Sequence, residues 1–496
     1  MSTVEKTVWP LLIDGELQMA ADGETFTTFD PSTGEAIGEV ARGRAADMDR
    51  AVKAARRAFE DEWFDSLPLE RSRLLATAGR RILEAADELA ELGAQSSGFP
   101  LAAVRRDVQA AARYFEYYAG MPDKIAGEVV PLGPDFLDYA VREPWGVCAI
   151  IVPFNSPYQL FSRSVAPALA AGNTVVVKAP EQASLGVMRL ARLLAEIGLP
   201  AGVLNVVPGL ADAGPPLVTH PEIDHITFTG SLATGRRVME SAAQNMVPVT
   251  MELGGKSPHI VFEDADGAEV AKTIVSSFVW SAGQACSSGT RVLVHKSIHR
   301  DLAGSVAEGI RRTSVGRAID DPDMGPLISE KQRDLVLTRI AAGVESGARL
   351  ITGGGKPRDA DLAGGFFVEP TVFDGVERSS SLAREEIFGP VISLIEFEGE
   401  AQAIDLANDS EYGLIAGVWT NDIGRAHRVA RKIKAGQIYV NTYGVGAGVE
   451  IPFGGYKKSG FGREKGVAGY FEYTQLKNVC VKIVLPKSPA WAPSPE

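Results

Sequence analysis

Residues 146–152 read Gly-Val-Cys-Ala-Ile-Ile-Val, a continuous apolar run. Such a run, without polar alternation, is typical of a strand that is buried on both faces of a sheet. Similar strands are predicted downstream, each followed by apolar residues at helical spacing. The strands are 174–178, 203–207 and 225–228, and the helices are 159–170, 185–197 and one ending near 243. This order predicts a mostly parallel, doubly wound sheet, with ligands at the carboxyl ends of its strands.

The rest of the chain adds two further kinds of structure. A second α/β region follows Gly254-Gly255 and runs to about residue 455. Its strands are predicted at 259–262, 291–294, 391–397, 415–419 and 437–440. Before residue 146, short edge strands (9–45) and helices (47–120) precede a Pro- and Gly-containing segment, 121–145, that predicts a protruding hairpin. A chain of 496 residues is too long for one core and predicts two or three domains.

Composition narrows the possible functions. The net charge of -13 and the lack of long basic blocks argue against nucleic acid or anionic membrane as the main partner. No apolar run approaches the roughly 18 residues of a membrane span, and none follows the N-terminus as a signal segment. Cys148, Cys286 and Cys480 are far apart, which fits a reducing cytoplasm without disulfides. The six scattered histidines predict no metal site.

Three residues are candidates for chemistry on their local context. Cys286 lies in a loop of small residues, 283–291, where a substrate can approach a thiolate nucleophile. A lone cysteine of this kind is also often a small buried hydrophobe. Glu252 ends a strand-like run beside a glycine pair, where it could act as a base or be a solvated strand end. Asn155 follows the first buried strand, and its amide could donate to an oxyanion or serve an ordinary turn.

Phosphate-binding patterns give a weaker signal. No GxGxxG follows a predicted strand, so the usual dinucleotide fingerprint is absent. Residues 228–235 instead place Gly230 and Ser231 where a strand meets a helix, which fits either phosphate binding or a simple helix cap. Residues 253–257 look like the end of a P-loop, but Thr250 stands where that motif needs glycine.

Taken in order, these segments resemble the aldehyde dehydrogenase superfamily over roughly residues 10 to 480. The joint presence of Glu-Leu-Gly-Gly-Lys-Ser-Pro and Gly-Gln-x-Cys is the most specific part of the resemblance. The matching segments are 153–157, 177–181, 228–231, 251–258, 283–286, 385–390, 439–441 and 452–455. The resemblance implies a Rossmann-like cofactor domain (1–120 and 146–253), an α/β catalytic domain (254–455), and oligomerisation elements with a tail (121–145 and 456–496).

The resemblance also implies a mechanism. Cys286 would attack an aldehyde as a thiolate, with the Asn155 amide and the Cys286 backbone N–H holding the oxyanion. Glu252 would activate the water that hydrolyses the resulting thioester. Glu464, in a Gly-Arg-Glu segment, resembles a second acid used for proton exit, although an exposed carboxylate is the alternative. Lys178 is expected among the catalytic residues as well as at the cofactor.

The implied cofactor is NAD, with NADP as the alternative. Lys178 and Glu181 match the family's adenosine-ribose contacts, and a carboxylate there disfavours the 2′-phosphate of NADP. Glu386 would hold the nicotinamide ribose, with Phe388 beside it. The remaining expected cofactor contacts are Val152, Pro153, Phe154, Gly209, Gly230, Ser231, Gly235 and Leu253.

Departures from the family pattern bear on the substrate. Arg163 occupies a pocket-facing position at which semialdehyde-type members carry an arginine, but Trp280 replaces the second arginine of their carboxylate clamp. Benzaldehyde-type members also carry the first arginine. We therefore expect an aromatic or medium-chain apolar aldehyde, with a semialdehyde bound by Arg163 as the alternative. The expected pocket residues are Tyr158, Arg163, Trp280, Ala285, Ser287 and Phe453.

Two other functional classes stay open on the sequence. A member that passes the acyl group to coenzyme A is disfavoured by the presence of Glu252, and a non-catalytic binding protein by that of Cys286 and Asn155. Members of the family pair through a hairpin like 121–145 and a terminal strand like 470–485. The resemblance therefore implies a homodimer or homotetramer.

Overall fold

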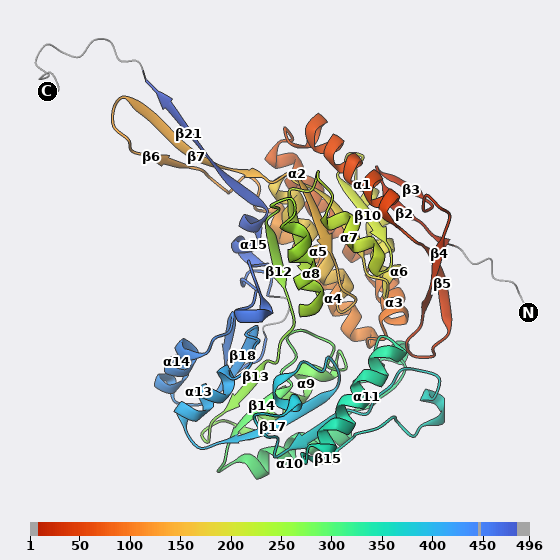
Figure 1. Cartoon of the computed structure of the whole chain (residues 1–496), viewed down its shortest axis with the longest axis vertical. Helices are drawn as coiled ribbons and strands as arrows, with labels where there is room; N and C mark the ends of the chain where they lie inside the picture. The colour runs from red at the N-terminus through yellow and green to blue at the C-terminus, as the bar shows by residue number, and fades with distance from the viewer. Residues whose placement is uncertain (1–7, 445–447, 484–496) are drawn as a thin grey trace, which may run out of the picture.

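The computed structural model describes residues 8–444 and 448–483. Two large α/β units, each built on one sheet, form the two lobes of the molecule in Figure 1, and a narrow three-stranded sheet projects from the upper lobe. A further small sheet at the N-terminal edge joins β1 (Val8–Trp9), β5 (Ala36–Ala41) and β4 (Thr25–Phe29).

The first large sheet confirms the predicted doubly wound topology. Its strand order is β20-β12-β11-β8-β9-β10-β2-β3, and the strands from β12 to β10 are parallel to one another. Antiparallel strands close both edges. The strands are β2 (Leu11–Ile13), β3 (Glu16–Gln18), β8 (Val147–Ile151), β9 (Thr174–Ala179), β10 (Leu204–Pro208), β11 (His225–Thr229), β12 (Val249–Glu252) and β20 (Gly460–Phe461).

Helices cover both faces of this sheet, which explains the unbroken apolar run in β8. Cys148 and Ile150 pack into a core with helices α2 to α6, whereas Val147 and Ala149 pack on the opposite face with α1, α7 and α8. The helices are α1 (Ala45–Ala58), α2 (Pro68–Glu84), α3 (Ala86–Ser97), α4 (Leu101–Ala119), α5 (Pro157–Ala171), α6 (Ser184–Ala195), α7 (Gly214–Val218) and α8 (Leu232–Ala242).

The second large sheet has the order β15-β16-β17-β14-β13-β18-β19 and is parallel except for the edge pair of β15 and β16. Its strands are β13 (Pro258–Val261), β14 (Arg291–His295), β15 (Arg349–Thr352), β16 (Thr371–Asp374), β17 (Val391–Phe397), β18 (Ile415–Trp419) and β19 (Gln437–Val440). Its helices are α9 (Gly267–Val279), α10 (His299–Arg312), α11 (Glu330–Glu345), α12 (Ser381–Arg384), α13 (Glu400–Asn408) and α14 (Ile423–Lys432).

The projecting sheet contains the predicted hairpin. It joins β6 (Glu128–Val130), β7 (Phe136–Pro144) and β21 (Thr474–Lys482), with β7 in the centre. The predicted strand at 470–485 begins later than expected, because α15 (Gly466–Glu472) precedes it, and residues 484–485 lie outside the described part of the chain. The segment before α15 also differs from the predicted division, since β20 pairs with β12 in the first large sheet.

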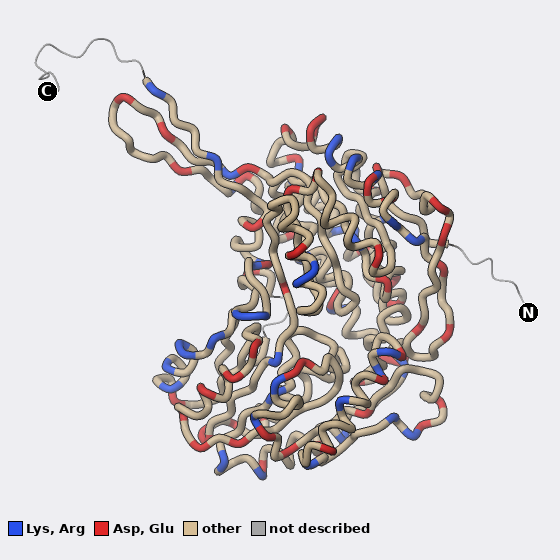
Figure 2. Tube along the Cα trace, viewed as in Figure 1, with Lys and Arg blue, Asp and Glu red and all other residues tan. Residues whose placement is uncertain are grey.

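Charge is distributed over both large units. Figure 2 shows basic and acidic residues interspersed along the chain, in keeping with the many surface ion pairs between them. Within the described residues, no helix combines the length and apolar character that crossing a membrane requires.

Candidate active site

The predicted functional residues of the first large sheet lie where its parallel strands end. Asn155 follows β8 in the loop before α5, and Lys178 lies near the end of β9. Glu252 is the last residue of β12. Because these strands run parallel in one sheet, their carboxyl ends share one edge, which is where such sheets bind ligands.

Cys286 lies between α9 and β14 and lines a cavity of about 630 Å³. This cavity brings together residues from both large units. The predicted site residues along its wall are Asn155, Arg163, Trp280, Ala285, Cys286, Ser287 and Phe453. One cavity is therefore lined by the candidate nucleophile, the candidate amide donor and most of the expected substrate contacts.

The loop that carries Cys286 is held from both sides. The hydroxyl of Tyr443 donates to the carbonyl of Ser287 at 2.8 Å. The Gln284 side chain accepts the backbone N–H of Ile328 at 2.9 Å. Gly283 has a φ of +72°, and a Cβ there would lie 2.0 Å from the carbonyl oxygen of Gly389. A side chain at this position would be excluded, so glycine is required for the tight turn.

Burial opposes ionisation of both central acids. It raises the pKa of the Cys286 thiol to about 11, against the nearby positive charges of Arg163 and Lys465. Glu252 is 2% exposed, and burial raises its pKa well above the usual range. In the described part of the chain neither carboxylate oxygen of Glu252 has a hydrogen-bond partner. A carboxylate of raised proton affinity is suited to accept a proton from water.

Arg163 and Glu464 form a buried ion pair at this cavity. The Arg163 guanidinium contacts the Glu464 carboxylate through Nε and donates to the Thr229 hydroxyl at 3.1 Å. The Ser164 hydroxyl donates to Glu464 at 2.6 Å. Glu464 is 1% exposed, so the alternative of an exposed carboxylate is wrong. The charge of Arg163 is thus already balanced by the protein.

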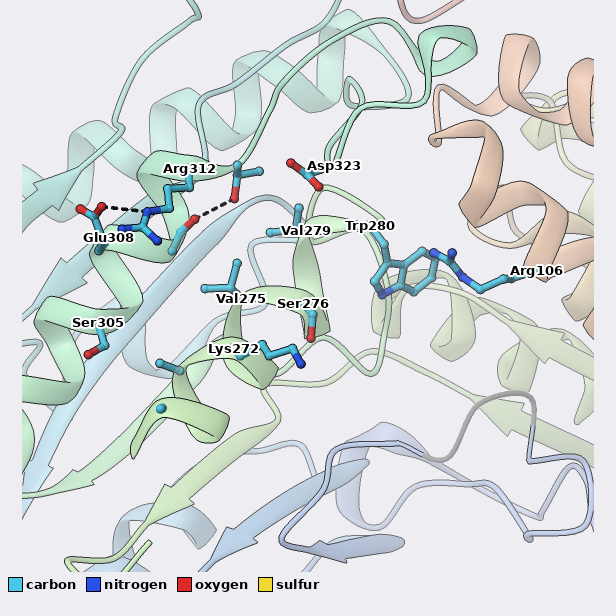
Figure 3. A pocket seen from close by; sticks show the side chains of 14 residues that line it. Arg106, Lys272, Val275, Ser276, Val279, Trp280, Ser305, Glu308, Arg312 and Asp323 are labelled. Carbon is cyan, nitrogen blue, oxygen red and sulfur yellow. Dashed lines mark hydrogen bonds and ion pairs between the residues drawn. The ribbon is translucent and has the colours of Figure 1, made fainter. Parts of the chain in front are cut away.

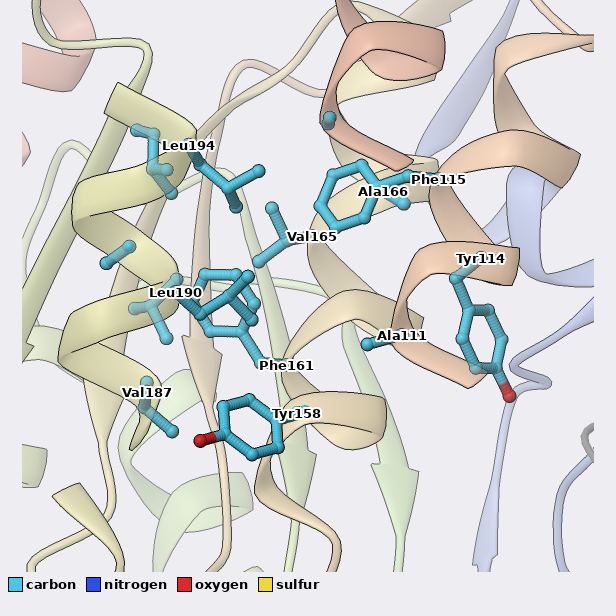
Figure 4. Packing of buried hydrophobic residues seen from close by; sticks show 14 of the residues in the cluster. Ala111, Tyr114, Phe115, Tyr158, Phe161, Val165, Ala166, Val187, Leu190 and Leu194 are labelled. Atoms are coloured by element: carbon cyan, nitrogen blue, oxygen red, sulfur yellow. The ribbon is translucent and has the colours of Figure 1, made fainter. Parts of the chain in front are cut away.

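Tyr158 does not take its predicted place in the substrate pocket. Its side chain is fully buried, and the hydroxyl donates to the carbonyl of Leu89 at 2.5 Å. Figure 4 shows the ring in the core between α5 and α6, near Phe161 and Val187. Gly186 makes room for it, because a Cβ there would lie 2.3 Å from the Tyr158 hydroxyl. The first turn of α5 therefore points Tyr158 away from the cavity.

The predicted pyrophosphate contacts lie at the start of α8. Ser231 caps this helix, since its hydroxyl oxygen accepts the backbone N–H of Thr234 at 3.3 Å. Gly235, in the first turns, packs so closely on Leu253 that a Cβ would lie 2.7 Å from the leucine side chain. The remaining N–H groups of this helix start are available for an anion.

A second group of predicted cofactor contacts centres on Glu386. Its carboxylate accepts the backbone N–H of Gly255 at 2.9 Å, and burial raises its pKa to about 7. Gly254 also packs against the Glu386 carboxylate, because a Cβ at Gly254 would lie 2.0 Å from it. The rings of Phe388 and Phe154 meet edge to face, with centroids 5.9 Å apart.

Lys178 lies with the cofactor candidates. It is largely buried, and burial lowers its pKa, against the charges of Glu181 and Asp212. Val152 donates its backbone N–H to the Lys178 carbonyl at 3.3 Å. Lys178 does not line the cavity around Cys286. Its neighbours favour a contact with the cofactor ribose over a role in the chemical steps.

In residues 8–444 and 448–483, no group of three or more His, Cys, Asp or Glu side chains is arranged to hold a metal ion.

Comparisons with known proteins identify the family of this chain. The model of the aldehyde dehydrogenase family matches residues 18–479. The chain belongs to the aldehyde dehydrogenase family. A provisionally named aldehyde dehydrogenase from Burkholderia cenocepacia is 45% identical, with a TM-score of 0.93 over 95% of this chain and 99% of that one. An NAD+ complex of aldehyde dehydrogenase from Bacillus cereus is 39% identical, with a TM-score of 0.94 over 96% of this chain and 97% of that one. Betaine aldehyde dehydrogenase from Staphylococcus aureus, in complex with NAD+, is 36% identical, with a TM-score of 0.94 over 98% of this chain and 97% of that one.

The aldehyde dehydrogenase cavity also contains residues that the motifs did not predict. They are Arg106, Asp107, Gln159, Gln437, Tyr443 and Lys465. Lys465 directly follows Glu464, and Tyr443 follows the matched segment 439–441, so proximity to the motifs was the available signal. Arg106 and Trp280 continue into an adjoining groove of about 720 Å³ beside α9 and α10, shown in Figure 3.

Breaking the buried ion pair should destabilise the dehydrogenase strongly. Arg163→Met removes the ion-pair partner of the buried Glu464 carboxylate, a loss of about 3–5 kcal/mol. Arg163→Met with Glu464→Gln removes both charges and should recover most of that stability. Thermal unfolding midpoints of the two single variants and the double variant provide the test. The coupling would be contradicted if the double variant lost as much stability as Arg163→Met alone, or as much as the sum of the two single variants.

Proposed function

We propose that this protein oxidises an aldehyde to a carboxylic acid with NAD. The observation that carries the proposal is the shared cavity wall of Cys286 and Asn155, with Glu252 buried at the end of β12, in the same sheet as the strand before Asn155. Family membership and the NAD+ complexes of the Bacillus cereus and Staphylococcus aureus relatives support it.

In the proposed first step, the Cys286 thiolate attacks the aldehyde carbon and forms a thiohemiacetal. The negative charge moves to the former carbonyl oxygen. The Asn155 amide and the backbone N–H of Cys286 donate hydrogen bonds to it. The backbone contacts of Gly283, Gln284 and Ser287 fix the loop, so these donors need little rearrangement as the charge develops.

Bound NAD would accept the hydride from the thiohemiacetal carbon, which leaves a thioester on Cys286. Glu252 then takes a proton from water as the water attacks the thioester. The carbon–sulfur bond breaks, the carboxylic acid leaves and Cys286 is regenerated. We assign proton exit to Glu464, which the Arg163 and Ser164 contacts hold within the same buried cluster.

The residues present fit a dinucleotide. The open N-terminus of α8 offers N–H groups to a pyrophosphate, and Glu386 offers a carboxylate to a ribose. Glu181 would accept hydrogen bonds from the adenosine ribose and repel a 2′-phosphate. Glu181 favours the charged form of Lys178, and that positive charge would reduce the disadvantage of NADP. We therefore propose NAD as the preferred cofactor.

Hydrolysis is favoured over acyl transfer to coenzyme A, because Glu252 is retained and its raised proton affinity suits a base. We also propose that two copies pair through the projecting sheet. Val129 is 74% exposed and Leu476 64% exposed there, on strands that stand away from the main body. The free cysteines fit action in a reducing compartment such as the cytoplasm.

For the substrate we propose an aromatic or medium-chain apolar aldehyde. Trp280, Phe453 and Tyr443 line the cavity and offer apolar ring surface. Arg163 also lines it, but Glu464 already balances its charge, which disfavours a carboxylate clamp at this arginine. The semialdehyde alternative therefore loses the residue on which it depended.

Cys286→Ala should abolish aldehyde-dependent NADH formation, because no other described side chain in the cavity is a thiol. The measurement is NADH absorbance with a range of aldehydes, using NAD and NADP in parallel. Cys148→Ala is the matched control: this cysteine is buried in the core of the first sheet and should not affect the chemistry. Unchanged NADH formation in Cys286→Ala would rule out the covalent mechanism.

Glu252→Gln should still form the first equivalent of NADH but slow steady turnover by about 10²–10⁴-fold, because water loses its base. Burial raises the pKa of Glu252, so deacylation in the unmodified enzyme should rise with pH as this group ionises, well above the usual carboxyl range. Rapid-mixing absorbance at several pH values would show both effects. Loss of the first NADH equivalent would place Glu252 in acylation instead.

Benzaldehyde should have a higher kcat/KM than succinic semialdehyde. The pocket lacks the second arginine of a carboxylate clamp, and aromatic rings line it. Both features favour the apolar substrate. The panel should include hexanal and acetaldehyde, to separate ring recognition from simple chain length. A clear preference for succinic semialdehyde would contradict the proposal.

A further inference from the structure

A second cation lies at the cavity beside Arg163. Lys465 lines the same cavity as Cys286, and its Nζ lies 5.0 Å from the ring centroid of Phe453. The guanidinium of Arg163 lies 5.2 Å from the same ring. The two cations thus meet one aromatic side chain, but the Arg163 charge is balanced by Glu464.

The backbone holds Lys465 in an unusual conformation. Its φ is +66° and its ψ is 162°, in a region that residues other than glycine rarely adopt. Gly466 follows with a φ of +58°, and a Cβ there would lie 2.7 Å from the Glu450 carbonyl. The conformation is therefore imposed by close packing at the start of α15. A lysine is an unfavourable choice at such a position unless its side chain contributes something in return.

Several charges surround the Cys286 sulfur. Arg163 on α5 and Lys465 favour the ionised thiol, whereas Glu252 on β12 and Glu386 oppose it. Glu464, also close to Lys465, is engaged by Arg163 and Ser164. Burial lowers the pKa of Lys465 to about 8, so its ammonium form still predominates at neutral pH.

We propose that Lys465 stabilises the thiolate form of Cys286. It acts through the nucleophile, as an electrostatic partner on the cavity wall. This inference deepens the proposed function and rests on Cys286 as the nucleophile. It gives the strained lysine a role: its side chain adds a positive charge to the wall of the cavity that contains Cys286.

The test is alkylation of Cys286 by iodoacetamide in the full-length protein, without aldehyde or cofactor, followed by peptide mass spectrometry. Iodoacetamide is uncharged, so Lys465 cannot attract it directly. Lys465→Met should move the rate–pH profile to higher pH. Each unit of that shift slows alkylation about tenfold below the pKa of the thiol. Lys465→Arg should restore most of the rate. Exposed Cys480 is the internal reference and should react equally in all variants.

Two further variants separate charge from structure. Lys272→Met removes an exposed lysine of α9 in the adjoining groove (Figure 3) and should leave the profile unchanged. Lys465→Gly relieves the positive φ, so it should fold at least as well as the unmodified protein, yet shift the profile as Lys465→Met does.

An unshifted profile in Lys465→Met or in Lys465→Gly would overturn the inference. If Lys465→Met left the profile unshifted and also raised the KM for succinic semialdehyde, Lys465 would instead be a contact for a substrate carboxylate. These outcomes are distinct from failure of the proposed function, in which Cys286→Ala would keep its NADH formation.

Discussion

The buried ion pair between Arg163 and Glu464 is the contact on which the catalytic cavity depends. Arg163 comes from α5 on the first sheet, whereas Glu464 comes from the segment between β20 and α15. The backbone of Glu464 also pairs with Phe453, through hydrogen bonds of 2.6 and 2.7 Å. The pair therefore fixes the position of the cavity wall at Phe453 as well as its charge. Two charges buried this deeply are tolerated only when they neutralise each other.

Burial makes the cavity chemically demanding. Desolvation disfavours the ionised forms of Cys286 and Glu252 alike, and each anion further disfavours the other. In the proposed mechanism, a thiolate nucleophile and a carboxylate base must nevertheless ionise in turn. A carboxylate that is reluctant to lose its proton serves the second step, whereas the thiol needs positive charge nearby. The positive charges of Arg163 and Lys465 offset part of this cost for both groups.

Much of the fold could be predicted from the sequence because β8 and its neighbours are apolar on both faces, and their order along the chain implies parallel pairing. The motif residues Cys286 and Asn155 reach one cavity, as predicted. Tyr158 was misplaced because a residue in the first turn of a helix can face either way, and the space at Gly186 decides which. Lys465 and Tyr443 were missed because their contacts join segments far apart in the sequence.

The short link from Glu252 to Pro258 explains why the two sheets meet so closely. It connects β12 of the first sheet to β13 of the second, and so leads from the base to the unit that carries Cys286. At Gly254 the carboxylate of Glu386 leaves no space for a Cβ, and at Gly255 a Cβ would lie 2.7 Å from the carbonyl oxygen of Cys286. A side chain at Gly254 or Gly255 would push Glu386, the loop that carries Cys286, or both away from Glu252. The glycine pair is thus a steric condition for packing Glu386 and the Cys286 loop against the link that follows Glu252.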